Sequence, residues 1–432
     1  MIKFLFVSLL ALFAVILFVI GYVLITLEHR IGTHKSAISL ALAGALWILA
    51  GIEISDKSIL EHQISEAGTE VFGIVIFLLA AMALVEILIH YRFFDLLRMK
   101  LSSLHFSDRK QFAIMAILTF FLSAILDNLT VTIVMIQIAR RFYKDENLIV
   151  AAAGIVVMAN AGGAWSPIGD VTTIMLWLAG KFDALSIISQ GFLPSATIGI
   201  IALWGIGRKI KNSSFEIKEE LKLKFSRGEK SIISLAIFSF SLPFFMNFLH
   251  LPPYMGLLFG LGLVWLLIEF AKTRSQRETH LGANIDRLLQ RVDISSLEFF
   301  IGILLSVSAL HALGILEIVS HALFGESFSF ERVLSGNVIM GLLSAVVDNV
   351  PLTAIAIDTI KATDPSLWVL TALTVGTGGS ALIIGSVAGV VAMGMIKQLT
   401  FGKYLKIATA PAIIGYFAAV GVWFLQYKFL LN

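Results

Sequence analysis

Three aspartates stand in long apolar segments that otherwise carry no formal charge. Asp127 and Asp348 are each followed by an asparagine, at Asn128 and Asn349, and Asp170 follows a glycine-rich string. A charged side chain at the centre of a membrane costs at least about 2.5 to 3.5 kcal/mol. Because of this cost, a carboxylate in such a segment is expected to have a function, such as binding a cation or carrying a proton. Neighbouring carboxylates do not all ionise easily, so such a site can hold either protons or a cation.

Two glycine-rich stretches lie close to these aspartates. Residues 161–170 read Ala-Gly-Gly-Ala-Trp-Ser-Pro-Ile-Gly-Asp, and residues 376–386 contain Gly-Thr-Gly-Gly-Ser and Gly-Ser. Glycine weakens a helix, and proline removes a backbone donor. We expect both segments to unwind and to line a cavity, because irregular backbone is not tolerated against lipid. The break residues are Gly162, Gly163, Ser166, Pro167, Gly169, Gly378, Gly379 and Gly385.

Side chains with oxygen atoms gather at or near these breaks, and we take them as candidate proton- and cation-binding residues. A small hard cation prefers carboxylate, hydroxyl and carbonyl oxygens. The aspartates and asparagines also have a purely structural interpretation as N-caps of half-helices, which does not exclude binding. The candidates are Asp127, Asn128, Thr130, Asn160, Asp170, Thr172, Thr173, Asp348, Asn349, Thr377, Ser380 and Ser386.

Three further residues are candidates for a proton relay. Glu86 and His90 are four residues apart and share one face of a predicted helix, where they could equally form an interfacial pair near the cytoplasm. His311 follows His90 by 221 residues and is expected well inside a span. Glu317 and Asp358 are expected to be solvated near the outer surface.

The composition identifies a membrane protein. The chain is 58% hydrophobic and 14% charged, whereas soluble domains average about 25% charged residues. Apolar blocks match the roughly 20 residues that cross a bilayer core. The chain has no cysteine, which excludes disulfides and thiolate chemistry. We therefore expect an all-α polytopic protein in a lipid bilayer, without enzymatic activity, cofactor or nucleic-acid partner.

The apolar blocks predict full spans and two hairpins. The hairpins, 111–141 and 333–361, are split by polar residues and are expected to enter and leave on one side. The first span is expected to be retained, since it is longer than a signal-peptide core. The ten spans lie near 4–26, 37–54, 71–90, 148–180, 187–207, 231–249, 254–271, 298–320, 367–396 and 404–427.

Loop charges give the orientation. The basic segments 208–230 and 272–291 should be cytoplasmic, and the uncharged turn between them should be outside. All loops agree only if both broken stretches are hairpins, and both chain ends then lie outside. The remaining loops are expected inside at 91–110 and 140–147, and outside at the acidic loop 55–70 and at 321–332.

An internal repeat relates the two halves. Residues 123–130 align with 344–351 at an offset of 221, and Gly162-Gly163 with Ile168-Gly169-Asp170 align with Gly378-Gly379 and Ile384-Gly385-Ser386 at an offset of 216. The hairpins open from opposite sides, which predicts inverted repeats with a site near the midplane. The expected division is 1–70 for N-terminal spans, 71–207 for repeat 1, 208–297 for basic loops and linking spans, and 298–432 for repeat 2.

The motifs resemble those of the NhaD-type sodium/proton antiporters of the ion transporter superfamily, which also contains the dicarboxylate carriers. The resemblance rests on Asp127-Asn128-Leu129-Thr130, the string 162–173, Asp348-Asn349-Val350-Pro351 and 376–380, and it covers most of the chain. It implies exchange of cytoplasmic Na⁺ or Li⁺ for external H⁺ at a bacterial cytoplasmic membrane. It also implies a homodimer whose transport domain moves against a scaffold. From the residues themselves we expect sodium to bind through Asp127, Asn128, Asp348 and Asn349.

Other functions remain open at this stage. An organic-anion or oxyanion carrier of the same superfamily would need cationic groups near the hairpin tips, where no Lys or Arg occurs. An intramembrane aspartyl protease would need its two aspartates on ordinary facing helices. A channel fits the composition, but inverted broken helices favour alternating access.

Overall fold

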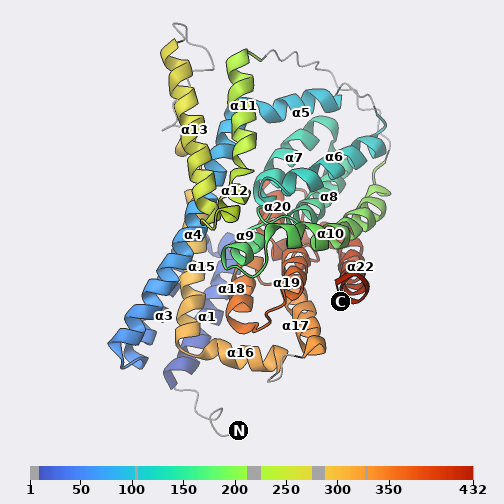
Figure 1. Ribbon diagram of the computed structural model, residues 1–432. Coiled ribbons are helices and arrows are strands. Elements are labelled where there is room, and N and C mark those ends of the chain that lie inside the picture. Colours follow the sequence, from blue (N-terminus) through green and yellow to red (C-terminus); the bar gives the residue numbers. More distant parts are fainter. Residues whose placement is uncertain (1–8, 103–105, 212–224, 275–287, 326–328, 432) are drawn as a thin grey trace.

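The computed structural model describes residues 9–102, 106–211, 225–274, 288–325 and 329–431, which fold into helices joined by short turns (Figure 1). Eight helices of this described part are long and apolar enough to cross a membrane, and no strand occurs in it. The expected all-α polytopic membrane protein is thereby confirmed. The number of spans and the re-entrant character of the hairpins stay predictions.

The helices that build the fold are, in chain order, α1 (Leu9–Thr26), α3 (Lys35–Glu53), α4 (Lys57–His90), α5 (Phe93–Ser102), α6 (Asp108–Ser123), α7 (Asn128–Phe142), α8 (Asp145–Gly163), α9 (Val171–Leu178), α10 (Ala184–Gly207), α11 (Arg227–Ser239), α12 (Leu242–Phe248), α13 (Pro253–Arg274), α15 (Ile294–Ala312), α16 (Ile315–Phe324), α17 (Phe330–Leu343), α18 (Asn349–Thr359), α19 (Pro365–Gly378), α20 (Val387–Met395) and α22 (Ala410–Gln426).

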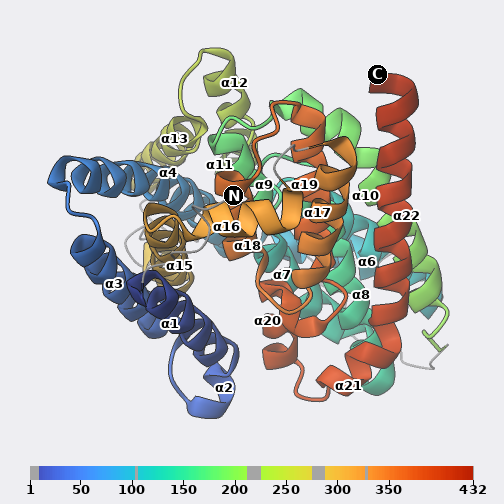
Figure 2. The same cartoon turned by 90° about the horizontal axis from the view of Figure 1, so that it is seen from below.

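These helices pack in two groups, seen side by side in Figures 1 and 2. The framework group consists of α1, α3, α4, α11, α12, α13 and α15. The hairpin group consists of α6 to α10, α17 to α20 and α22. The groups touch where α18 packs on α15 and α9 packs on α4.

Helix α8 lies at the centre of the hairpin group and is buried around its whole circumference. Its sequence is apolar on every side, as expected for a helix enclosed by others. In the framework group, α3 and α15 approach closely at Gly302, where a Cβ atom would lie 2.5 Å from the carbonyl carbon of Ser39. The backbones of α3 and α15 are therefore in direct contact at this point.

The acidic loop expected at 55–70 is wrong. Asp56 accepts the backbone N–H of Ser58 and caps a helix that runs without interruption from Lys57 to His90. Thirty-four residues extend about 51 Å at 1.5 Å per residue, which exceeds the bilayer core of about 30 Å. The acidic residues therefore lie on a helical extension.

The span expected at 298–320 is also wrong. Helix α15 ends at Ala312, Gly314 has a φ of 72°, and α16 starts at Ile315. A residue in the left-handed conformation ends an α-helix, and glycine adopts this conformation without strain. Figure 2 shows α16 crossing from the framework group to the hairpin group.

The span expected at 231–249 is interrupted. Helix α11 ends at Ser239, and Pro243 lies in the first turn of α12. Proline is suited to a first helical turn but not to a helix interior. Five of the basic residues expected in the cytoplasm, Lys218, Lys222, Lys224, Arg277 and Arg287, lie outside the described residues, as do residues 4–8 of the first span.

Candidate functional site

The two hairpin tips dock on the two broken helices in the same way. At the first tip, between α6 and α7, the Ser123 hydroxyl donates to the carbonyl of Ala159 at 2.6 Å. At the second tip, between α17 and α18, the Ser344 hydroxyl donates to the carbonyl of Val375 at 2.8 Å. The offsets of 221 and 216 residues are those of the sequence repeat, so the repeat is also structural.

Close backbone contact explains the glycines of both breaks. A Cβ atom on Gly162 would lie 2.2 Å from the backbone oxygen of Phe120, and one on Gly378 would lie 1.8 Å from that of Gly341. No real side chain tolerates such distances. Within the breaks, Cβ atoms on Gly163, Gly169, Gly379 and Gly385 would similarly lie 2.5 to 2.6 Å from carbonyl oxygens.

Both discontinuous helices are interrupted as expected. Between α8 and α9, residues 164–170 form turns that contain Ser166 and Pro167. Between α19 and α20, residues 379–386 form the equivalent connection. Four half-helices, α7, α9, α18 and α20, therefore begin near the breaks.

Each of these four helix N-termini is capped by a residue of the sequence motifs. The side chains of Asp127, Asp170, Asp348 and Ser386 accept backbone N–H groups of α7, α9, α18 and α20. A helix N-terminus carries about half a positive charge. Three of these positive ends are thus balanced by carboxylates of the chain itself.

The two hairpin aspartates are not equivalent caps. Asp127 accepts both the N–H of Thr130 at 2.9 Å and its hydroxyl at 2.6 Å. The second hairpin has Pro351 at the position of Thr130, and proline offers neither group. Asp348 instead accepts the N–H of Val350 at 3.0 Å through Oδ1. No donor for its Oδ2 atom is found within the described part of the chain.

The asparagines after the caps point to the discontinuous helices. Asn128 donates through Nδ2 to Oδ1 of Asn160 at 3.1 Å. Asn160 donates in turn to the hydroxyls of Ser380 at 2.9 Å and Ser386 at 3.0 Å. This chain of contacts joins the first hairpin and the first broken helix to the second broken helix.

Asn349 of the second hairpin contacts the carboxylate of the first broken helix. Its Nδ2 atom lies 3.3 and 3.2 Å from the two carboxylate oxygens of Asp170. Asp170 is 1% exposed. A Cβ atom on Gly376 would lie 3.4 Å from Asp170 Oδ2, and Gly376 aligns with Asn160. The second repeat therefore leaves room for the carboxylate where the first repeat has an amide.

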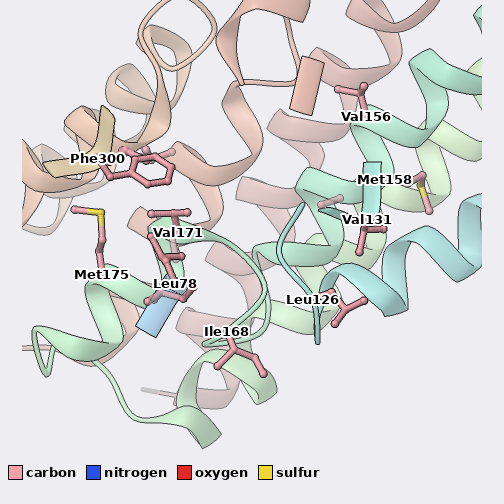
Figure 3. Packing of buried hydrophobic residues seen from close by; sticks show 14 of the residues in the cluster. Leu78, Leu126, Val131, Val156, Met158, Ile168, Val171, Met175 and Phe300 are labelled. Atoms are coloured by element: carbon pink, nitrogen blue, oxygen red, sulfur yellow. The ribbon is translucent and has the colours of Figure 1, made fainter. Parts of the chain in front are cut away.

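A small cavity joins these groups. Its volume is 30 Å³, and roughly 10 to 15 Å³ is enough to hold one water molecule. Hairpin-group residues at its wall include Asp127, Asn128, Asp170 and Asn349. Across from them stand Leu78 and Met82 of α4 and Ser296 and Phe300 of α15, some of which appear in Figure 3. Among the described residues, no Lys or Arg lines this cavity.

Several predicted site residues lie near the breaks without lining the cavity. The Thr377 hydroxyl donates to Leu373 of its own helix, and Thr173 completes a capping box with Asp170. Thr172 donates its N–H to Asp170 at 3.3 Å, and within the described residues its buried hydroxyl has no hydrogen-bond partner. Asp348 also stands outside the cavity wall.

The candidate relay residues lie away from the cavity. His90 is the last residue of α4, and Glu86 is one turn before it. The expectation that His311 lies well inside a span is wrong, because it sits in the last turn of α15 and its side chain is 53% exposed. Its Nδ1 atom lies 3.3 Å from Oδ2 of Asp358, which is therefore paired and not merely solvated.

Sequence reasoning missed the framework side of the site. Leu78, Ser296 and Phe300 come from apolar helices without any motif, so no signal marks them. Tyr22 of α1 accepts the backbone N–H of Asp348 at the second hairpin tip. A single tyrosine in an apolar span gives no indication of this contact.

Comparison with known proteins identifies the family. A family model described as "Citrate transporter" (CitMHS) matches residues 7–376. The chain belongs to this family. Sodium/proton antiporter 2 of Arabidopsis thaliana is 36% identical over 430 residues, which cover 96% of this chain and 100% of that protein.

Bacterial relatives are sodium/proton antiporters as well. The Na⁺/H⁺ antiporter NhaD of Alkalimonas amylolytica is 32% identical, over 96% of this chain and 90% of its own length. The NhaD protein of Vibrio cholerae is 31% identical, over 94% of this chain and 90% of its own length. The resemblance to NhaD-type antiporters is confirmed, and the chain is a multi-pass membrane transporter and not an enzyme.

Proposed function

We propose that this chain exchanges Na⁺ or Li⁺ from the cytoplasm for external protons across a bacterial cytoplasmic membrane. The observation that carries the proposal is the ion-sized cavity at which Asp170, Asn349, Asp127 and Asn128 meet. Its donor set consists of carboxylate and amide oxygens, which suit a hard monovalent cation. The antiporter names of the relatives support the same ion pair.

Carboxylates allow the two ions to compete for one site. In one state the aspartates release their protons and coordinate the cation, while amide and hydroxyl oxygens complete its shell. The hairpin group then moves relative to the framework group and exposes the site on the other side. Protons displace the cation there and return with the site. Sodium transport is coupled to proton transport because a site that holds neither ion has several charged carboxylates without a partner. Such charges are costly in a dry environment, so the empty site does not move across.

An anion carrier is the second candidate, and two observations favour it. The description of the family model names citrate. In addition, four helix N-termini lie near the breaks, and helix N-termini bind anions readily. Against it, three of these N-termini are already capped by aspartates. An incoming anion would face these carboxylates without a Lys or Arg in the described cavity wall.

The assembly is expected to be a homodimer, as in the related carriers. Exposed apolar side chains cover the outer faces of α1, α13 and α22, and lipid or a second subunit would cover such faces in a membrane. Molecular mass in detergent by light scattering would distinguish one chain from two.

Reconstituted vesicles test the function directly. Purified protein is placed in liposomes with an internal pH dye, a proton gradient is imposed, and Na⁺, Li⁺, K⁺ or citrate is added. Dissipation of the gradient by Na⁺ or Li⁺ is the expected result. Dissipation by citrate alone, accompanied by citrate uptake, would establish the anion carrier instead.

A further inference from the structure

A second and larger cavity lies between the two helix groups. We call it the vestibule; its volume is 660 Å³. Its wall includes Ile74 of α4, Met175 of α9, Leu304 of α15 and Ala354 of α18. The loop charges predict that this end of α4 lies on the outside of the membrane.

The vestibule and the small cavity at Asp170 use the same four helices. The small cavity is lined by Leu78, Val171, Phe300 and Val350. On every helix the two cavities are separated by four residues: Ile74 and Leu78, Met175 and Val171, Leu304 and Phe300, Ala354 and Val350. Four residues of α-helix extend about 6 Å. The two cavities are therefore about one helical turn apart.

The four residues of these pairs that line the small cavity are all apolar. We call Leu78, Val171, Phe300 and Val350 the septum; all four are buried. In Figure 3 the labelled septum residues Leu78, Val171 and Phe300 lie next to Met175 of the vestibule. An apolar constriction blocks ions because it cannot replace their hydration shell.

The septum is contributed by both helix groups. Leu78 and Phe300 belong to the framework group, and Val171 and Val350 belong to the hairpin group. Helix α9 runs from Val171 at the site to Met175 at the vestibule. A shift of the hairpin group toward the vestibule by one turn, about 5.4 Å, would bring Val171 to the present level of Met175. Asp170 and Asn349 would then face the vestibule.

We propose that the septum is the barrier between the cation site and the outside, and that the vestibule is the external ion passage. The proposal rests on the proposed function for its orientation. One-turn steps of packed helices are a known means of switching between two stable arrangements. Opening therefore requires a displacement of one helical turn and no unfolding of either hairpin.

The cysteine-free sequence permits a direct test by thiol labelling. Single variants Ile74→Cys and Ala354→Cys probe the vestibule, and Leu78→Cys and Val350→Cys probe the septum on the same two helices. Intact, right-side-out vesicles are treated with a membrane-impermeant cationic thiosulfonate. Ala151→Cys on buried α8 serves as the unreactive control.

Vestibule cysteines should react from outside under every condition. Septum cysteines should react several-fold more slowly at rest and should accelerate when a Na⁺ gradient drives turnover. Equal reactivity of Ile74→Cys and Leu78→Cys at rest would exclude a barrier between them. If the vestibule cysteines reacted only with reagent added on the inside, the vestibule would be an internal passage and the proposal would be contradicted.

Side-chain truncation gives a second test with a matched control. Phe300→Ala removes the largest septum side chain, whereas Phe299→Ala removes its buried neighbour, which lines neither cavity. Vesicles with Phe300→Ala should lose an imposed proton gradient several-fold faster than those with Phe299→Ala, without added Na⁺. Equal leaks would place the barrier elsewhere. The difference in labelling at rest does not depend on exchange, so absent Na⁺/H⁺ exchange with vestibule cysteines that still react several-fold faster than septum cysteines at rest would contradict the proposed function alone.

Discussion

Asp170 is the carboxylate that both repeats enclose. It caps α9 in the first repeat, accepts from Asn349 of the second, and lies beside Gly376. Asp170→Asn keeps a side chain that caps a helix well and removes only the charge. We expect a folded protein without detectable Na⁺/H⁺ exchange in the vesicle assay. Retention of full exchange would exclude Asp170 from the ion-binding step.

The two hairpin asparagines have different partners, and their loss should have different effects. Asn349 donates to a carboxylate, whereas Asn128 donates to the amide of Asn160. Hydrogen bonds to charged groups contribute about 1.5 to 3 kcal/mol, against about 1 for neutral pairs. Asn349→Ala should therefore raise the apparent KM for Na⁺ by about 10- to 100-fold.

Asn128→Ala is the matched comparison and should raise the apparent KM for Na⁺ by less than about tenfold. Sodium-dependent proton efflux across a concentration series gives both constants. A larger effect at Asn128 would show that the first hairpin, and not Asp170 with the second, holds the ion more tightly.

Among the elements, the broken helices depend on backbone contacts that admit no side chain. Gly162→Ala and Gly378→Ala would each place a methyl group against a carbonyl oxygen. We expect destabilisation of about 1 to 3 kcal/mol or more from such overpacking, seen as a lower thermal midpoint in detergent. Gly262→Ala on α13 is the control, since no described atom beyond its own stretch of helix lies within 4 Å of its Cβ position. Equal midpoints for all three would contradict the tight docking of the tips.

The position of the breaks follows from the sequence, whereas two helix ends do not. Pro167 and the glycines around it weaken the helix in which they occur, whatever packs against it. The unwound segment can therefore be predicted from these residues alone. The end of α15 depends on Gly314 in a left-handed conformation, and a lone glycine in an apolar run does not indicate its φ angle. The start of α4 depends on the Asp56 cap. Several acidic residues follow Asp56, and the sequence does not indicate which of them begins a helix.

At the scale of the molecule, the repeat predicts which residues correspond but not which residues meet. The offset of 216 aligns Asp170 with Ser386, yet the contacts of Asn160 and Asp170 run across the repeats. The framework wall of the site, with Leu78 and Phe300, follows only from how two helix groups pack. Apolar helices carry no sequence mark for the face that a partner will cover.

The ion pair between His311 of α15 and Asp358 of α18 bridges the two helix groups. Together with Glu66 and Glu70 of α4, the pair lines a separate cavity of about 70 Å³, distinct from the one at Asp170. The pair is charged on both sides only when the imidazole is protonated. Acidic external solution should therefore hold the groups in the observed arrangement and slow exchange.

His311→Gln removes this charge and should extend exchange to more acidic external pH. A partly exposed pair contributes about 0.2 to 1 kcal/mol, so the rate at the acidic end should rise by up to about fivefold. His62→Gln is the control, because His62 pairs with Glu66 within α4 and bridges nothing. Exchange rates in vesicles across external pH give both profiles. Superimposable profiles for His311→Gln and the unaltered chain would show that the bridge does not restrain the movement of the hairpin group.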